Sequence, residues 1–314
     1  MDHTGLPKRE AIGVDRILGP PPEGYGRTVD VKALLRRYGI QPSKGLGQNF
    51  LVDESVADRI VAASDLEPHD VVLEVGPGTG LLTRRLADRV AQLVAVELDR
   101  KMVKVLADTL RGRDNVRVVQ GDILQIDFVA ELMAVLELQE AASLSYKVVA
   151  DLPYYITSAV LRRLLSARVR ATLLTLMVQR EVAERIVSGP GSLSLLAISV
   201  QVYGQAELVC LVPARAFYPQ PKVESAVLRV RLYEAPRVPE ADLPRFFRVA
   251  RAAFGQKRKQ LHNSLTHNLH LPRERVLAAL AVAGIDSRRR PQTLGIDEWA
   301  ELARAFYPTP GPSP

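Results

Sequence analysis

The sequence predicts an α/β protein, with a mostly parallel sheet between helices and a small all-helical domain at its C-terminal end. Short apolar runs alternate with helical patterns over residues 50–235, which is typical of parallel strands joined by crossover helices. One such run, Val71–Val75, leads into Gly-Pro-Gly-Thr-Gly at residues 76–80 and then into a helical pattern. Beyond residue 239 the strand-like runs stop and only helical patterns remain.

Composition limits the kind of protein. The 314 residues are 47% hydrophobic, enough for one large core and a smaller domain. No apolar run has transmembrane length and no signal peptide is visible, so we expect a cytoplasmic protein without membrane contact. The single cysteine, Cys210, excludes an intrachain disulfide and a cysteine-based zinc site, and its apolar neighbours predict a core position. The histidines have no metal-ligand spacing, so we expect no metal.

The N-terminal region contains an unusual loop. Residues 1–28 are rich in glycine and proline without an apolar period, which predicts a disordered extension. Helices are expected at residues 31–38 and 53–63. The glycine-punctuated loop between them, residues 42–51, contains glutamine, asparagine and phenylalanine just before the first buried strand. This mixture suggests a lid over a ligand, although a plain connector is the alternative.

The remaining elements follow in order from their apolar patterns. The predicted strands are residues 93–96, 116–119, 147–150, 173–178, 208–212 and 225–232, of which the last two could pair antiparallel at one sheet edge. The predicted helices are residues 101–110, 128–138, 157–165, 179–187, 194–203, 243–254, 275–283 and 297–306. We therefore expect a ligand-binding catalytic domain at residues 29–235, a helical domain at 236–306 and a tail at 307–314.

Acidic side chains lie at or near the ends of four successive predicted strands: Glu74, Glu97, Asp122 and Asp151. The carboxyl ends of parallel strands meet at one sheet edge, where doubly wound folds bind ligands. Any one of these residues alone could be an ordinary loop acid. Four in register predict a ligand site, and Glu97 occupies the position from which a carboxylate usually holds ribose hydroxyls.

The glycine spacing indicates the kind of ligand. Glycine lets the chain turn sharply and lets a ligand approach the backbone, so Gly76 and Gly78 are candidate binding residues. A dinucleotide fingerprint requires Gly-x-Gly-x-x-Gly, but here the third glycine, Gly80, comes one residue early. Glu74 would repel a pyrophosphate and would suit a cation. S-adenosylmethionine (AdoMet), which carries a sulfonium and an ammonium group, fits this pattern.

The sequence Asp-Leu-Pro-Tyr at residues 151–154 is the strongest catalytic candidate. The exocyclic amine of a nucleobase is a weak nucleophile, and the Asp151 carboxylate with a backbone carbonyl could accept its two N–H bonds. Pro153 removes a competing N–H and stiffens the turn, and Tyr154 offers a ring for stacking an extruded base. Phe217, in a proline-rich loop, could form the other side of a base sandwich. The alternatives are an ordinary strand-end turn and a packed loop.

Positive charge is concentrated in the C-terminal part. The chain carries a net charge of +7, and residues 236–314 contain 13 Lys and Arg against 7 Asp and Glu, which is +6 of that total. A solvated basic face is the usual explanation for a single charge run. Charge this segregated favours contact with a phosphate backbone, with Lys257, Arg258 and Lys259 as candidate RNA-binding residues.

Taken together, these motifs resemble the ribosomal RNA adenine N6-dimethyltransferase family, in particular the bacterial enzyme that dimethylates two adjacent adenosines near the 3′ end of 16S rRNA. The likeness spans roughly residues 34–305 and rests on several ordered segments. They are residues 47–51, 74–80, 96–99, 121–122, 151–154, 217–225, 254–259 and 263–265.

The resemblance implies a Rossmann-like class I AdoMet-dependent methyltransferase sheet, a monomer, and a role in small-subunit ribosome maturation, with 16S rRNA in the small subunit or its precursor as substrate. It also implies that a set of residues contacts AdoMet or the reacting centre: Asn49, Leu51, Gly76, Glu97, Asp122 and Asp151. Within that set Glu97 would hold the ribose and Asp122 the adenine amino group. The family has Asn at the first position of Asn-Leu-Pro-Tyr, whereas Asp151 keeps an acceptor oxygen, loses the amide donor and adds charge.

Two rival functions remain open on the sequence. One is a 23S rRNA adenine N6-methyltransferase of the macrolide-resistance type, which shares the catalytic domain. The segment at residues 256–259 and the helical domain around it favour the 16S enzyme. The other is a non-catalytic relative that binds RNA or DNA. The intact glycine turn argues against this alternative, while Asp151 argues weakly for it.

Overall fold

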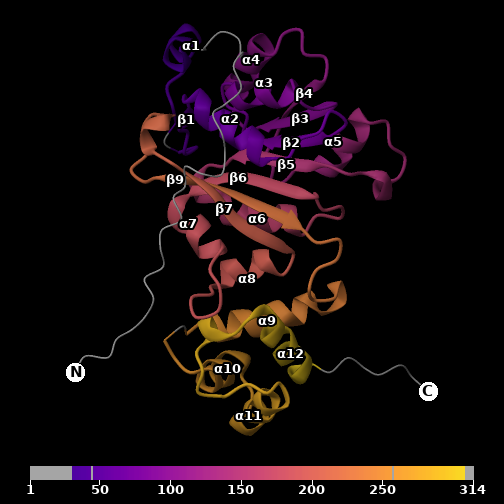
Figure 1. Cartoon of the computed structure of the whole chain (residues 1–314), viewed down its shortest axis with the longest axis vertical. Helices are drawn as coiled ribbons and strands as arrows, with labels where there is room; N and C mark the ends of the chain where they lie inside the picture. Colours follow the sequence, from indigo (N-terminus) through magenta and orange to yellow (C-terminus); the bar gives the residue numbers. More distant parts are fainter. Residues whose placement is uncertain (1–29, 44, 257, 308–314) are drawn as a thin grey trace.

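The computed structural model describes residues 30–43, 45–256 and 258–307, with a helical part at one end of a sheet-containing part (Figure 1). The extension predicted at residues 1–28 and Lys257 lie outside the described residues, as does the tail beyond residue 307. The strands are β1 (Phe50–Leu51), β2 (Val71–Val75), β3 (Gln92–Glu97), β4 (Val116–Gln120), β5 (Lys147–Asp151), β6 (Leu173–Gln179), β7 (Gly204–Val212), β8 (Phe217–Tyr218) and β9 (Ser225–Leu232). The helices are α1 (Val31–Arg37), α2 (Glu54–Ala63), α3 (Leu81–Ala87), α4 (Arg100–Thr109), α5 (Phe128–Val135), α6 (Thr157–Leu165), α7 (Arg180–Ile186), α8 (Leu195–Gln201), α9 (Leu243–Phe254), α10 (Leu261–Leu269), α11 (Arg273–Val282) and α12 (Ile296–Phe306). None of these helices is long and apolar enough to cross a membrane.

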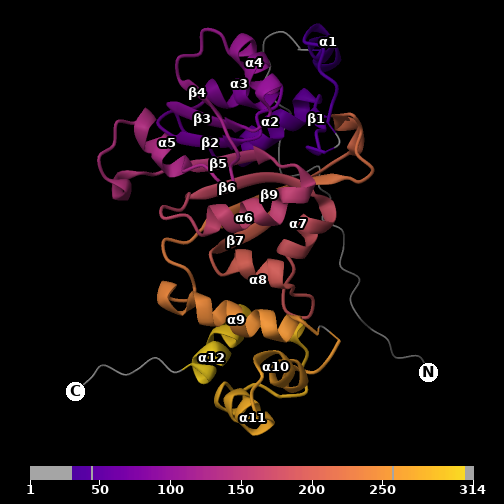
Figure 2. The same cartoon turned by 180° about the vertical axis from the view of Figure 1, so that it is seen from behind.

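Seven strands form one sheet in the order β4-β3-β2-β5-β6-β9-β7, in which the first five run parallel. β9 lies antiparallel between β6 and β7, so the antiparallel pair predicted at one edge is confirmed. β7 begins at Gly204, earlier than predicted. The prediction missed its first residues because exposed Gln205 and Glu207 interrupt any apolar run there. Helices cover both faces of the sheet (Figure 2), which confirms the Rossmann-like α/β class.

The central strands are buried on both faces, as expected for a parallel sheet. All five residues of β2 are buried. Because side chains alternate across a strand, Leu73 and Val75 join the apolar cluster on one face, and Val72 joins the cluster that holds α2 and α3 on the other. Cys210 belongs to this second cluster and is 5% exposed, which confirms its predicted core position. Because the first five strands run parallel, their carboxyl ends lie at the same edge of the sheet.

The C-terminal part contains four α-helices among the described residues, whereas three were predicted. The prediction missed α10 because its sequence is rich in Asn, Ser, Thr and His, which have low helix propensity. Leu261, Leu265 and Leu269 nevertheless recur every fourth residue and are buried between the neighbouring helices. Tertiary packing therefore stabilises a helix that the local sequence favours only weakly.

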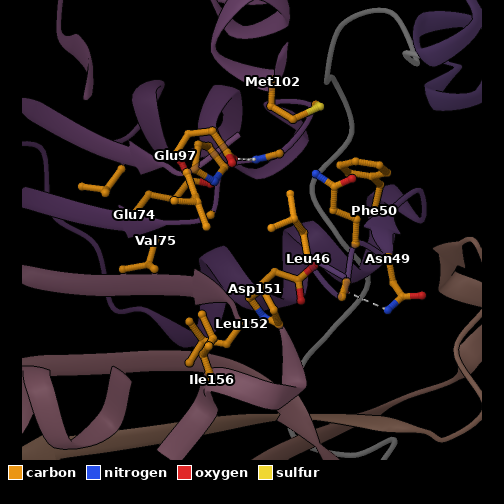
Figure 3. A pocket seen from close by; sticks show the side chains of 18 of the residues that line it. Leu46, Asn49, Phe50, Glu74, Val75, Glu97, Met102, Asp151, Leu152 and Ile156 are labelled. Atoms are coloured by element: carbon orange, nitrogen blue, oxygen red, sulfur yellow. Dashed lines mark hydrogen bonds between the residues drawn. The ribbon is translucent and has the colours of Figure 1, made fainter. Parts of the chain in front are cut away.

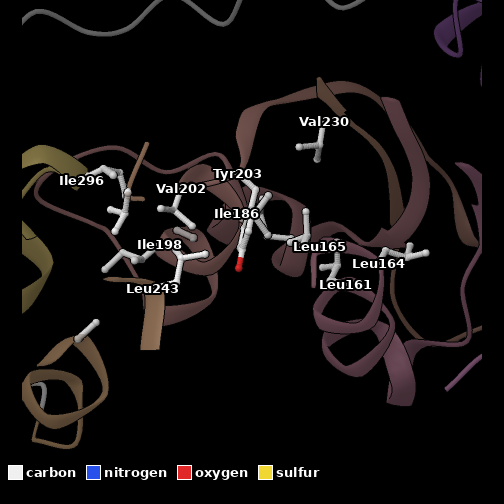
Figure 4. Close-up of a cluster of buried hydrophobic side chains, with 14 of the residues drawn as sticks. Leu161, Leu164, Leu165, Ile186, Ile198, Val202, Tyr203, Val230, Leu243 and Ile296 are labelled. Carbon is white, nitrogen blue, oxygen red and sulfur yellow. The ribbon is translucent and has the colours of Figure 1, made fainter. Parts of the chain in front are cut away.

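The helical part is packed firmly against the sheet-containing part. Leu243 of α9 and Ile296 of α12 belong to the same buried cluster as Ile198 of α8 (Figure 4). Backbone N–H groups of Gly191 and Leu193 donate to the carbonyl of Gln292 at 2.8 and 3.3 Å. The two regions thus share one apolar cluster, so the helical part occupies a fixed position relative to the sheet.

Candidate active site

One pocket opens at the carboxyl edge of the sheet and is lined by segments that are far apart in the sequence (Figure 3). The ends of β2, β3 and β5 and the turn after β4 form its walls, and the loop at residues 46–49 borders it. The four predicted acids all line this pocket: Glu74, Glu97, Asp122 and Asp151. The other predicted cofactor-binding and catalytic residues line it too: Asn49, Leu51, Gly76, Gly78, Pro153, Tyr154 and Phe217.

The turn between β2 and α3 follows a path that requires glycine. Gly76, Gly78 and Gly80 have φ angles of 72°, 55° and 80°, in the left-handed region that other residues rarely adopt. A Cβ on Gly78 would lie 3.2 Å from the Phe50 ring, and one on Gly80 would lie 3.1 Å from the Thr109 hydroxyl. The turn therefore leaves no room for a side chain between the sheet edge and the loop above it.

Glu97 ends β3 and is hydrogen-bonded to the glycine turn. Its Oε2 accepts from the backbone N–H of Gly78 at 3.2 Å, and its Oε1 accepts from the backbone N–H of Asp99 at 2.8 Å. Burial raises the pKa of the Glu97 carboxyl above its ordinary value, although the two N–H donors oppose this shift. Glu97 is therefore a fixed acceptor at the edge of the pocket, suited to hydroxyl donors.

Glu74 and Asp122 differ in how they are held. Glu74 is 1% exposed, and its Oε2 has no hydrogen-bond partner among the described residues. Burial, and to a lesser degree the nearby carboxyls of Glu97 and Asp151, raises the pKa of Glu74 to about 8. The Asp122 carboxylate is partly exposed and accepts from the backbone N–H of Leu124 at 2.9 Å. One oxygen of the buried Glu74 carboxyl thus lacks a hydrogen-bond partner among the described residues, whereas Asp122 is already oriented by its own turn.

The loop that borders the pocket is fastened to the sheet edge by Gln48. Its Nε2 donates to Oδ2 of Asp99 at 2.9 Å, and its Oε1 accepts from the backbone N–H of Ser43 at 2.8 Å. Asn49 follows directly and donates from Nδ2 to the carbonyl of Gly47 at 3.2 Å. Side-chain hydrogen bonds therefore hold the loop in place at the border of the pocket, and its role as a lid stays a prediction.

Asp151 ends β5 and is partly exposed at the pocket wall. Burial raises the pKa of its carboxyl to about 7. The backbone N–H of Leu152 donates into β6 at 3.1 Å, which holds the turn in place, and Pro153 has no N–H to offer. The hydroxyl of Tyr154 shares a hydrogen bond of 2.7 Å with Oγ of Ser225, so the tyrosine ring is anchored from β9.

Phe217 reaches the pocket through a short strand pairing. It lies in β8, opposite Leu51 of β1, and is 4% exposed. Phe217 and Tyr154 line the same cavity, and the base sandwich between them stays a prediction. Tyr155, which is not among the predicted site residues, also lines the pocket, with 60% of its surface exposed. Its position in the sequence could have indicated this, because a second tyrosine directly after the predicted motif offers another ring on which a base can stack.

The charged side chains of the pocket lining are all acidic. Its described lining includes four carboxyl groups and no lysine, arginine or histidine. Such a site attracts an organic cation and repels a pyrophosphate. Across the described ranges, no group of His, Cys, Asp and Glu side chains is arranged to hold a metal ion.

The predicted RNA-binding residues lie between α9 and α10, outside the pocket lining. Arg258 and Lys259 are exposed and form no ion pair with another described residue, and Lys257 lies outside the described residues. Several other arginines of the helical part pair with acids of the same part: Arg237, Arg245, Arg288, Arg289 and Arg304. Their charge is locally balanced, so the excess positive charge rests on the remaining cations.

Known sequences resemble the chain over most of its length. Residues 41–306 match the family model described as ribosomal RNA adenine dimethylase. The chain is 45% identical over 283 residues to the Ribosomal RNA small subunit methyltransferase A of Moorella thermoacetica, which covers 90% of this chain and 97% of that protein. The protein of the same name from Geobacillus kaustophilus is 43% identical over 289 residues, covering 90% and 96%.

Solved structures resemble it as well. The crystal structure of the 23S rRNA methyltransferase ErmE has a TM-score of 0.64 at 32% identity, covering 82% of this chain and 99% of that chain. A dimethyladenosine transferase from Plasmodium falciparum has a TM-score of 0.68 at 24% identity, covering 81% and 95%. This second likeness concerns the fold alone.

Proposed function

Because the chain belongs to the ribosomal RNA adenine dimethylase family, we propose that it uses AdoMet to dimethylate the N6 amino groups of two adjacent adenosines near the 3′ end of 16S rRNA. The substrate would be the small ribosomal subunit or its precursor, and the reaction would belong to subunit maturation. We further propose that the enzyme acts as a monomer in the cytoplasm, where this substrate is assembled.

The acidic pocket is the observation that carries the choice of cofactor. A sulfonium and an ammonium group would be favoured by four carboxyl groups without a competing cation, whereas the phosphates of a dinucleotide would not. The Oε2 atom of Glu74, which has no hydrogen-bond partner among the described residues, would interact with such a cation once the carboxyl is ionised. Glu97 would accept hydrogen bonds from the ribose hydroxyls, and Asp122 from the adenine amino group, while Gly76 and Gly78 let the ligand approach the backbone.

Bound AdoMet would supply an electrophilic methyl group, and the chain would position the amine that receives it. The Asp151 carboxylate would accept one N–H bond of the target amine, and a backbone carbonyl of the same turn the other. An ionised acceptor stabilises the positive charge that grows on nitrogen as the methyl arrives. The proton then becomes acidic, so the site needs an orienting acceptor more than a strong base. Tyr154 and Phe217 would hold the extruded base between them.

The comparisons favour the 16S substrate. The relatives named for the small subunit are 45% and 43% identical across nearly their whole length, whereas the 23S enzyme is 32% identical. The helical part and its exposed cations would supply additional contacts with rRNA phosphates. The 23S rRNA alternative is therefore not favoured, and the complete set of pocket residues argues against a non-catalytic relative.

The test is to map N6-dimethylated adenosines in rRNA from a strain that lacks this gene. Restoring the parent gene should restore dimethylation at two adjacent adenosines near the 3′ end of 16S rRNA. Restoring the gene with Asp151→Ala should not restore dimethylation, even when the variant protein accumulates to the same level as the parent. Modification of 23S rRNA, or no modification by the parent, would contradict the proposal.

A further inference from the structure

A second basic surface lies on the sheet-containing part, where α1 and α4 pack together. We name it the α1–α4 patch, and its exposed cations are Lys32, Arg36, Arg37, Arg100, Lys101 and Lys104. The single acid within these two helices is Asp108, which accepts a hydrogen bond from Tyr38 and pairs with Arg111. Residues 1–235 carry a net charge of only +1, so their total charge does not reveal this local excess of positive charge.

Most of these cations are not neutralised by neighbouring acids. Arg36, Arg100, Lys101 and Lys104 make no ion pair within the part of the chain that the structure describes. Other arginines of the sheet-containing part do form ion pairs, as in Arg113–Asp88, Arg117–Glu131 and Arg168–Asp127. A merely solvated helix face usually mixes both signs of charge. A face of unpaired cations provides the counter-charge that a phosphate backbone requires.

An apolar cluster beneath the patch joins its two helices. Val31 and Leu35 of α1 are buried in one cluster with Met102 and Val105 of α4. The cluster also contains Phe50, so the inner faces of both helices pack against the residue that contacts the glycine turn. Since apolar residues occupy the inner face, the cations are fixed on the outer face.

The patch also lies beside the mouth of the pocket. Met102 of α4 lines the pocket, and Arg100 begins the helix that follows Glu97. The ammonium group of Lys32 lies 5.0 Å from the centre of the Tyr218 ring, next to the pocket residue Phe217. In both views of the molecule, α1 and α4 lie at the opposite end from α9–α12 (Figures 1 and 2). The patch and the cations of the helical part therefore lie at opposite ends of the molecule, and the patch is the one next to the pocket.

We propose that the α1–α4 patch binds rRNA phosphates beside the target adenosine, on the side of the pocket away from the helical part. This inference rests on the proposed function, since it takes rRNA as the substrate. Two separated anchors would hold the RNA on both sides of the base that must leave its stack, and this would offset part of the unstacking energy. The patch would act in RNA binding and would not touch the reacting atoms.

The test uses the full chain and small ribosomal subunits from the strain that lacks the gene. In Arg36→Gln/Lys101→Gln/Lys104→Gln, three exposed cations without ion-pair partners are neutralised. The matched control, Arg117→Gln/Arg168→Gln/Arg185→Gln, removes the same charge from arginines that are paired with acids elsewhere on the domain. We expect the patch variant to bind subunits at least about tenfold more weakly, with a salt slope flattened by up to about 0.9 per lost phosphate contact.

Three further readouts separate this role from a structural one. The patch variant should keep the parent's melting temperature, its AdoMet affinity, and its single-turnover methylation rate at saturating subunits. Combining it with Arg258→Gln/Lys259→Gln should add the two losses of binding free energy, because the sites are far apart. Binding by the patch variant equal to that of the control would overturn the inference.

The inference and the proposed function can fail separately. If the parent methylates the 16S adenosines while the patch variant binds like the control, the α1–α4 patch is not an RNA anchor and the proposed function stands. If the parent binds subunits without methylating them, the proposed function fails, and the same binding comparison still decides the role of the patch. A parent that does not bind small subunits would overturn both.

Discussion

Gln48, in the loop that borders the pocket, and Asp99, which follows β3, are joined by a hydrogen bond of 2.9 Å. The same Asp99 donates its backbone N–H to Glu97, and Glu97 in turn accepts from the backbone N–H of Gly78. One chain of hydrogen bonds thus connects the lid loop, the end of β3 and the glycine turn. The proposed cofactor site is assembled from three segments, and these hydrogen bonds hold them together.

The first prediction concerns this connection. Gln48→Ala should weaken AdoMet binding by about five- to tenfold, the loss expected for about 1 kcal/mol of hydrogen bonding, because the lid loop loses its anchor. Asp99→Asn should have a smaller effect, since an amide oxygen can still accept from Gln48. Isothermal titration calorimetry measures both. The control is Gln205→Ala, at an exposed position in β7, which should bind AdoMet like the parent.

The second prediction concerns pH and Asp151. Burial raises the pKa of its carboxyl from 3.8 to about 7, so the ionised acceptor predominates above that pH and is lost as the pH falls below it. Single-turnover methyl transfer at saturating AdoMet should therefore rise with pH through about 7 and then level off. Asp151→Asn cannot titrate and should remain active without this acid-side fall. Asp151→Ala should cost on the order of 10²-fold in rate. A parent rate that is flat from about pH 6 to about pH 8.5 would contradict this account.

The third prediction concerns stability and Glu74. The pKa of its carboxyl is about 8 in the fold and 4.5 ordinarily, so between these values the folded state keeps a proton that the unfolded chain releases. The free energy of unfolding therefore falls as pH rises through this window. Glu74→Gln should remove that fall and be more stable than the parent above about pH 8, by about 1–3 kcal/mol, the scale for a buried unsatisfied group.

The same substitution should weaken AdoMet binding above about pH 8, because the ionised Glu74 carboxyl, and with it one negative charge of the pocket, is then lost. Urea unfolding at several pH values, together with calorimetry, measures both effects. Glu67→Gln is the control, since this side chain is 63% exposed and should change neither quantity. Parallel stability curves for parent and Glu74→Gln would show that the buried carboxyl does not titrate as described.

The fourth prediction distinguishes AdoMet from a dinucleotide. Gly78→Asp should abolish AdoMet binding, because the φ angle of 55° and the Phe50 ring 3.2 Å away leave no place for a side chain. Its carboxylate would also lie beside Glu97. Calorimetry with AdoMet, its demethylated product and NAD should show binding of the first two by the parent. Tighter binding of NAD than of AdoMet would reject the cofactor assignment.

The fifth prediction concerns the helical part. Neutralising Lys257, Arg258 and Lys259 together should weaken RNA binding and flatten the dependence of log K on log salt by up to about 0.9 per lost phosphate contact. AdoMet affinity should stay the same, because these residues do not line the pocket. An unchanged salt slope would mean that this segment is only a solvated basic face.

The sequence by itself determined the parallel sheet, the glycine turn and the acids of the pocket. These features depend on local patterns, such as apolar runs, left-handed glycine positions and the rule that parallel strands present their carboxyl ends at one edge. Glu74, Glu97, Asp122 and Asp151 could therefore be placed in one site without coordinates, and the structure lines one pocket with all four.

Only the tertiary structure decided the features that join distant segments. The hydrogen bond between Gln48 and Asp99 spans 51 residues, and the β1–β8 pairing brings Phe217 to Leu51. Helix α10 exists because its leucines find neighbouring helices, and the α1–α4 patch exists because two separate helices pack together. The raised pKa values also arise from burial in the assembled fold. Such contacts leave no local periodicity in the chain, because their stabilising energy comes from partners that only folding brings together.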